Sequence, residues 1–183
     1  MIPSVLVILA EGFEEVEAIT PIDLLRRSGA KVTVASLDTL AVKGAHGIVV
    51  HADTTLASCK KKPFDCVVLP GGGQGSKNLA ASFEVLEKVI ETAQSGVVAA
   101  ICAAPAVVLG KTGLLDGKRV TGYPGTEENC PGLVLENESF IVDGSLVTGQ
   151  GPGAAMPFSL ALIGVLFDQR TQEAITEQLK YKG

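Results

Sequence analysis

The sequence predicts an α/β protein built on a mostly parallel sheet. Apolar runs of strand length alternate with segments of helical periodicity, as they do in parallel βαβ units. No internal repeat, low-complexity region or linker interrupts this pattern, which predicts a single domain over residues 1–183. The expected strands are residues 4–10, 31–36, 47–51, 64–69, 97–101 and 118–122, followed by short runs at 133–135, 139–143 and 145–149.

Three further segments have the pattern of helices. Residues 84–95 carry apolar side chains at helical spacing, which predicts an amphipathic helix. Residues 158–167 are apolar nearly all round, so this helix is expected to be buried or covered by a second subunit. Residues 170–181 predict a polar amphipathic helix. The run at 4–10 lacks a basic flank and soon meets Glu11, so a first strand is expected there rather than a signal peptide.

Composition limits the possible classes of protein. Of the 183 residues, 46% are hydrophobic, which is enough for a sizeable core. A net charge of −5 disfavours nucleic-acid binding. No apolar run reaches the roughly 18 residues of a membrane span, and a cytoplasmic protein is expected. The four cysteines, at positions 59, 66, 102 and 130, have no Cys-x-x-Cys spacing, so neither a zinc site nor a disulfide framework is expected.

Cys102 ends the expected strand 97–101, and small residues lead from it into a helical pattern. Such a strand-to-helix turn lifts one side chain out of the sheet, as in the nucleophile elbow of serine hydrolases, although the glycine spacing of that elbow is absent. A thiol on the first turn of a helix also faces the positive end of the helix dipole, which favours the thiolate. Cys102 is therefore a candidate nucleophile, and the alternative is a buried core cysteine.

A glycine-rich segment, residues 71–75, follows the expected strand 64–69. Four glycines in these five residues allow the backbone to approach a reacting group closely. The lysine and hydroxyl residue of a P-loop are missing, and the glycine pattern of a dinucleotide site is absent. The segment is expected to supply amide donors for an oxyanion, and the alternative is a plain tight turn.

Glu17 lies in the first expected helix, on a face that it shares with Thr20, Pro21 and Leu24. A carboxyl group on a partly apolar face is desolvated, which raises its pKa and lets it move protons near neutral pH. The alternative is a solvated acid of the helix surface. Glu14 and Glu15 suit the first helical turn, where carboxylates complement the dipole.

Four segments together resemble the ThiJ/PfpI superfamily and, within it, the DJ-1 branch. They are LAEGFEEVE at 9–17, VLPGG at 68–72, AAICAAP at 99–105 and GQGPG at 149–153. The resemblance covers essentially the whole chain and implies a flavodoxin-like three-layer sandwich, related to class I glutamine amidotransferase domains, that forms a homodimer. It also implies that Cys102 is the reactive, oxidation-prone cysteine, that Glu17 hydrogen-bonds its sulfur, and that the amides of Gly72 and Ala103 are oxyanion donors.

The chain departs from the family pattern at several positions. Tyr123 stands before Pro124 where many relatives have a histidine. Its phenol can hydrogen-bond a substrate oxygen, which makes Tyr123 a third candidate catalytic residue beside Cys102 and Glu17, but a phenol is a poor base at neutral pH. Ala103 replaces the histidine that follows the cysteine in the protease-like branch, which disfavours a peptidase. Gln150 and His46 replace arginines found in some relatives, so an anion pocket is expected to be weaker. Gly71, Gly151 and Pro152 complete the candidate substrate-binding residues.

The leading hypothesis is a cofactor-free enzyme of glyoxalase III or deglycase type. It would act on small reactive 2-oxoaldehydes, or on glycated amines and thiols, through Cys102 and Glu17. The second hypothesis is an oxidative-stress sensor or redox-regulated chaperone that works through oxidation of Cys102. A third, an amidotransferase or peptidase, needs a histidine base, and both His46 and His51 lie in the first third of the chain.

Overall fold

A mostly parallel sheet runs through the centre of the molecule. The computed structural model describes residues 1–182, and its main sheet has seven strands in the order β5-β2-β1-β6-β7-β9-β8. Neighbouring strands are parallel except for β8 and β9, which are antiparallel. The strands are β1 (Ser4–Leu9), β2 (Lys31–Ser36), β5 (Thr54–Thr55), β6 (Cys66–Leu69), β7 (Val97–Ile101), β8 (Phe140–Asp143) and β9 (Leu146–Gly149).

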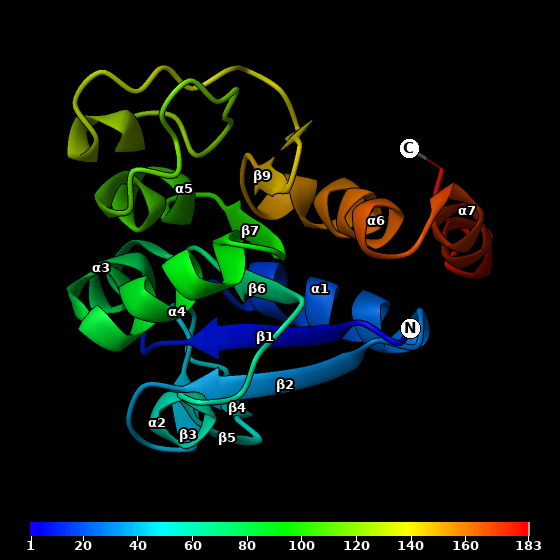
Figure 1. The fold of residues 1–183 in the computed structure, drawn as a ribbon, viewed down its shortest axis with the longest axis horizontal. Helices are drawn as coiled ribbons and strands as arrows, with labels where there is room; N and C mark the ends of the chain where they lie inside the picture. Colours follow the sequence, from blue (N-terminus) through cyan, green and yellow to red (C-terminus); the bar gives the residue numbers. More distant parts are fainter. Residues whose placement is uncertain (183) are drawn as a thin grey trace.

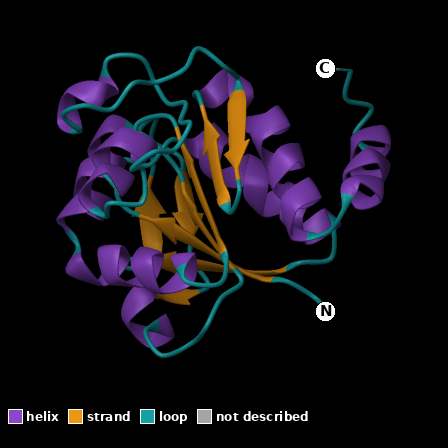
Figure 2. Cartoon of the chain, turned by 45° about the horizontal axis from the view of Figure 1, so that its top comes forward, coloured by secondary structure: helices purple, strands orange, loops and turns teal. Residues whose placement is uncertain are grey.

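Helices cover both faces of this sheet, so the molecule has three layers (Figures 1 and 2). One face carries α1 (Glu15–Arg27), α6 (Ala155–Leu166) and α7 (Gln169–Gln178). The other carries α2 (Leu56–Cys59), α3 (Gly73–Ala81) and α4 (Phe83–Ala93). The remaining helices are α5 (Ala104–Val107) and the short 3-10 turns η1 (Leu109–Lys111), η2 (Thr126–Asn129) and η3 (Pro152–Ala154). The prediction of an α/β sandwich with a mostly parallel sheet is confirmed.

The central strands β1, β6 and β7 form the core. Nearly all of their side chains are buried because helices lie over both faces of the sheet. A strand that is buried on both faces needs apolar residues at successive positions, not only at alternate ones. This requirement explains why these strands were recognisable as continuous apolar runs.

The nearly all-apolar segment near the C-terminus is helix α6, and neighbouring helices of the same chain cover it. It packs between α1 and α7 and against the sheet (Figure 1). Covering by a second subunit is therefore not needed to explain its composition. Within residues 1–182, no helix combines the length and the apolar character needed to cross a bilayer.

Two predicted strands, 118–122 and 133–135, are wrong, because both segments are irregular in the structure. β7 pairs directly with β9, so no place in the main sheet remains between them. Segment 118–122 is held by isolated hydrogen bonds instead of the regular hydrogen-bond ladder of a strand. The Thr121 amide donates to Thr148 Oγ1 at 3.0 Å, and the Glu136 amide donates to the Val120 carbonyl at 2.8 Å.

The predicted strand 47–51 exists only as β4 (Val49–His51), which lies outside the main sheet. It forms an antiparallel hairpin with β3 (Ala41–Lys43). The hairpin is fixed near the start of α1, since the Gly12 amide donates to the Lys43 carbonyl at 2.8 Å and the Ala45 amide to the Phe13 carbonyl at 2.8 Å. These two hydrogen bonds place the hairpin loop beside the first turn of α1.

Candidate active site

Cys102 occupies a strained turn between β7 and α5. Its φ of 65° lies in the left-handed region, which costs a residue with a side chain about 1–2 kcal/mol. Two backbone bonds hold it there: its amide donates to the Gly149 carbonyl at 2.9 Å, and its carbonyl accepts from the Tyr123 amide at 2.8 Å. Cys102 is largely buried, and 9% of its surface remains exposed. The strand, turn and helix lie where the sequence predicts them.

Glu17 reaches Cys102 from α1 and is fully buried, with 0% of its surface exposed. Its Oε2 accepts a hydrogen bond from the Gly71 amide at 2.9 Å. Its Oε1 is buried without an oxygen or nitrogen partner among the described residues, and the carboxyl group contacts the Cys102 thiol. Burial raises the pKa of Glu17 to about 7, although the bonds from Cys102 and Gly71 act in the opposite direction. Glu17 therefore titrates near neutral pH.

Two glycines allow the loop after β6 to touch this pair. A Cβ atom on Gly71 would lie 2.5 Å from Glu17 Oε2 and 2.6 Å from Cys102 Cβ, so no side chain fits. Gly72 has a φ of 91°, and a Cβ atom there would overlap the Gly12 carbonyl. The loop is shorter than the sequence suggests, because α3 begins at Gly73.

The protonation of Cys102 differs from the sequence-based expectation of a thiolate. Burial, together with the charge and hydrogen bond of Glu17, raises the pKa of Cys102 to about 12, while the Gly72 and Ala103 amides lower it. The helix that follows, α5, has only four residues and so supplies little dipole. Above neutral pH the pair therefore holds a thiol and a carboxylate, and the sulfur becomes nucleophilic when Glu17 takes its proton.

The candidate residues Tyr123, Gly151 and Pro152 lie together beside this turn. They line a hollow of about 560 Å³, and its described lining carries no charged side chain. Tyr123 is 52% exposed, and its backbone amide donates to the Cys102 carbonyl. A larger hollow, about 780 Å³ between α2 and α4, lies away from the cysteine and shares no residue with the pair.

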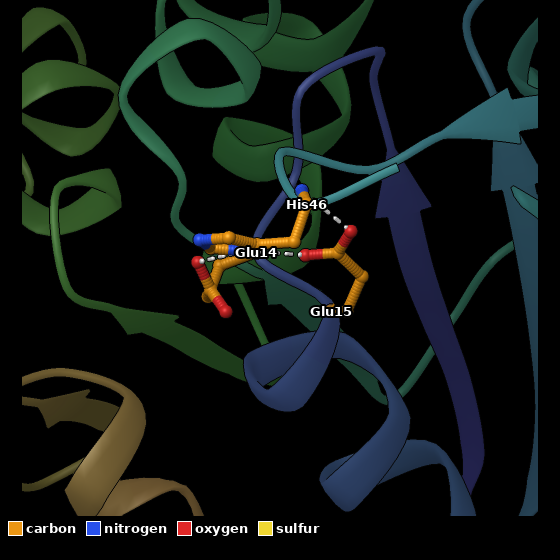
Figure 3. A group of neighbouring side chains, drawn as sticks. All are labelled: Glu14, Glu15 and His46. Atoms are coloured by element: carbon orange, nitrogen blue, oxygen red, sulfur yellow. Dashed lines mark hydrogen bonds and ion pairs between the residues drawn. The ribbon is translucent and has the colours of Figure 1, made fainter. Parts of the chain in front are cut away.

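A second group of ionisable side chains lies at the start of α1. Glu14 and Glu15 meet His46 from the β3–β4 loop (Figure 3). Sequence reasoning missed this group because 31 residues separate His46 from Glu15 and no motif joins them. Neither histidine is among the groups that influence the pKa of Cys102, so the histidine base of a peptidase or amidotransferase is not found beside the sulfur.

Comparisons with known proteins identify the family. Residues 3–164 match the model of the DJ-1/PfpI family, and the chain belongs to this family. It is 40% identical to Protein dj-1beta of Drosophila melanogaster, over 98% of this chain and 97% of that protein. It is 41% identical to Protein DJ-1 homolog A of Arabidopsis thaliana, over 96% of this chain.

The chain spans less than half the length of two Arabidopsis thaliana relatives, 46% of DJ-1 homolog A and 37% of homolog B. A protein named deglycase from Pyrococcus abyssi is 33% identical over 81% of this chain and 90% of its own length. Among solved structures, oxidized Toxoplasma gondii DJ-1 has a TM-score of 0.94 and 37% identity, covering 99% of this chain and all of that one.

Proposed function

We propose that this protein converts 2-oxoaldehydes, or their early adducts with amines and thiols, into 2-hydroxy acids without a cofactor. The observation that carries the proposal is the buried contact between the Cys102 thiol and the Glu17 carboxyl, beside two amides directed at the sulfur. A nucleophile beside a group that titrates near neutral pH is suited to addition and proton transfer. The Pyrococcus abyssi relative named deglycase agrees with this class of substrate.

In the first step, the Cys102 sulfur bonds to the aldehyde carbon while its proton passes to the Glu17 carboxylate. The aldehyde oxygen becomes an oxyanion, which the Gly72 and Ala103 amides would stabilise. Glu17 then protonates this oxygen, which gives a hemithioacetal and restores the carboxylate. The raised pKa of Glu17, about 7, suits a group that must both accept and release a proton.

In the second step, the Glu17 carboxylate removes the proton from the former aldehyde carbon, the electron pair forms a double bond to the adjacent carbon, and the oxygen on that carbon becomes negatively charged, which gives an enediolate. This oxygen then takes the hydroxyl proton of the first carbon. Glu17 returns the proton to that second carbon, which leaves a thioester of the 2-hydroxy acid. Water attacks the thioester, the carbon–sulfur bond breaks, and the thiol regains its proton. The first carbon is oxidised and the second reduced, so no external oxidant is required. The uncharged hollow beside Tyr123 would hold the rest of the substrate.

The test is lactate formation from methylglyoxal in the absence of glutathione. Native protein, Cys102→Ser and Glu17→Gln are compared, with Cys130→Ser as the control because Cys130 is a half-buried thiol outside the site. We expect catalytic lactate that is lost in the first two variants and kept in the control. Consumption of one aldehyde per chain without lactate, or full turnover in Glu17→Gln, would contradict the mechanism.

A sensor of oxidative stress, or a redox-regulated chaperone, is the second proposal. It is favoured by the similarity to a Toxoplasma gondii DJ-1 structure of the oxidized form and by the 9% of the Cys102 surface that remains exposed. Mass spectrometry after mild peroxide treatment tests it. Selective gain of two oxygens on Cys102 supports this role, whereas equal oxidation of Cys59, Cys66 and Cys130 would exclude it.

Homodimer formation is proposed with both functions. Exposed apolar side chains gather where α1 and the β3–β4 hairpin meet, namely Val16, Ile19, Ile48 and Val49. Contiguous exposed apolar surface of this kind is typical of interfaces. Light scattering of native protein and Ile48→Lys tests the proposal: the variant should be monomeric where the native chain is dimeric. The cytoplasmic location stays a prediction.

A further inference from the structure

The loop between β3 and β4 meets the start of α1 at three potential metal-ligand atoms (Figure 3). His46 Nδ1 lies 3.0 Å from Glu15 Oε2 and 3.5 Å from Glu14 Oε2. One ligand atom from each residue lies within 4.8 Å of the others. An imidazole nitrogen with two carboxylate oxygens is a donor set that suits Zn²⁺ and related divalent transition metals.

The spacing of these atoms fits a single ion. Zinc binds nitrogen and oxygen at about 2.0–2.2 Å, so two ligands of a tetrahedral ion lie about 3.4 Å apart. The two distances from His46 Nδ1, 3.0 and 3.5 Å, bracket that separation. An ion would take the place of the proton that Nδ1 shares with the carboxylates, and small side-chain movements would suffice.

The Glu15 carboxylate is held in place for such a role. Its Oε1 accepts hydrogen bonds from the amides of His46 at 2.8 Å and Ile48 at 3.3 Å. Its side chain is 6% exposed, and Oε2 is directed at the imidazole. Hydrogen bonds of this kind, made to a carboxylate that would ligate a metal ion, hold the ligand in its orientation. The His46 side chain is 70% exposed, so an ion can enter from solvent and water can complete its coordination.

The charges also favour a divalent cation. Among residues 1–182, the ion pairs of Glu14 and Glu15 involve only His46 and no lysine or arginine. The start of α1 contributes about half a positive charge. Two largely buried carboxylates therefore lie beside one imidazole and the start of a helix. Their two negative charges are not fully balanced by these positive groups. A divalent ion would balance both carboxylates.

We propose that Glu14, Glu15 and His46 bind one divalent transition-metal ion, with Zn²⁺ as the reference ion, and that the ion ties the β3–β4 loop to α1. The proposal does not depend on the function proposed above. It departs from the sequence-based expectation of no metal, which considered the cysteines and treated Glu14 and Glu15 only as helix-terminal acids.

Equilibrium dialysis with Zn²⁺, and absorption spectroscopy with Co²⁺, test the proposal. All proteins carry Cys102→Ser so that the Cys102 thiol cannot bind the ion. The key variant is His46→Arg, because arginine keeps a positive partner for the carboxylates but does not bind metals. His51→Ala is the control, since His51 is the other histidine of the chain.

We expect one equivalent of Zn²⁺ per chain and a Co²⁺ spectrum without a thiolate charge-transfer band. His46→Arg should weaken binding about tenfold or more while unfolding at the native temperature without metal, and His51→Ala should bind normally. The proposal is wrong if the protein takes up no ion at about 1 mM free Zn²⁺. It is equally wrong if His46→Arg binds Zn²⁺ as tightly as the protein with His46, or if His51→Ala weakens binding and His46→Arg does not.

Discussion

Glu17 should make the stability of this protein fall as the pH rises, and Glu17→Gln should abolish that fall. The carboxyl group is fully buried, and its pKa is about 7 in the folded protein against a reference value of 4.5. Because the folded-state pKa is raised, the protonated form is favoured by folding. The contribution to stability is therefore fully present below pH 4.5 and is lost as the pH rises through about 7.

The size of this effect follows from the two pKa values. The difference between 7 and 4.5 is 2.5 units, and at about 1.36 kcal/mol per unit the free energy of unfolding changes by about 3 kcal/mol. Native protein should lose about that much between pH 4.5 and 8.5 relative to Glu17→Gln, whose amide does not titrate. The Cys102 thiol stays protonated over this range because its pKa is raised to about 12.

Urea unfolding at a series of pH values measures the difference between the two proteins. Glu173→Gln, a variant of an exposed glutamate on α7, controls for the loss of one negative charge. The reasoning would be refuted if the difference between native protein and Glu17→Gln stayed constant from pH 4.5 to 8.5. A slope of the opposite sign would refute it as well.

Three other substitutions test the backbone around the site by urea unfolding. Gly72→Ala should destabilise the protein by about 1–3 kcal/mol, because φ is 91° and the new Cβ overlaps backbone, whereas Gly73→Ala meets open space and should be nearly neutral. A loss as large in the second variant would contradict this. Thr148→Val should cost about 1–3 kcal/mol because the buried Thr121 amide loses its acceptor, and an unchanged midpoint would count against it. Cys102→Gly should be about 1 kcal/mol more stable than Cys102→Ala, since glycine tolerates the φ of 65°, and equal stabilities would mean that the turn stores no strain.

Much of the sheet could be predicted because buried parallel strands need continuous apolar runs. Strands β1, β2 and β7 and helix α4 lie within a residue or two of their predicted bounds. The same reasoning failed at 118–122, where Val120 and Thr121 are buried but no strand ladder forms, since β7 and β9 pair directly with each other. Burial of a segment does not show which backbone groups will pair with it.

The sequence likewise predicted only part of the candidate site. The local pattern around Cys102 predicted a strand-to-helix turn, and the turn is present with a left-handed φ. The pattern could not give the protonation of Cys102, which depends on burial and on the charge of Glu17. Nor could it bring His46 to Glu15, because the hairpin that does so is fixed by contacts between distant segments.

The sequence by itself determined the α/β class, the order of the central elements and the identity of the cysteine, glutamate and glycines at the ends of the strands. These features depend on residue type and spacing, which act locally along the chain. Only the tertiary structure decided that Glu17 is buried against Cys102, that the thiol holds its proton more tightly than expected, and that His46 meets two glutamates. The burial of a titratable group and the charges near it shift its pKa, and both depend on atoms that the fold brings from distant parts of the chain.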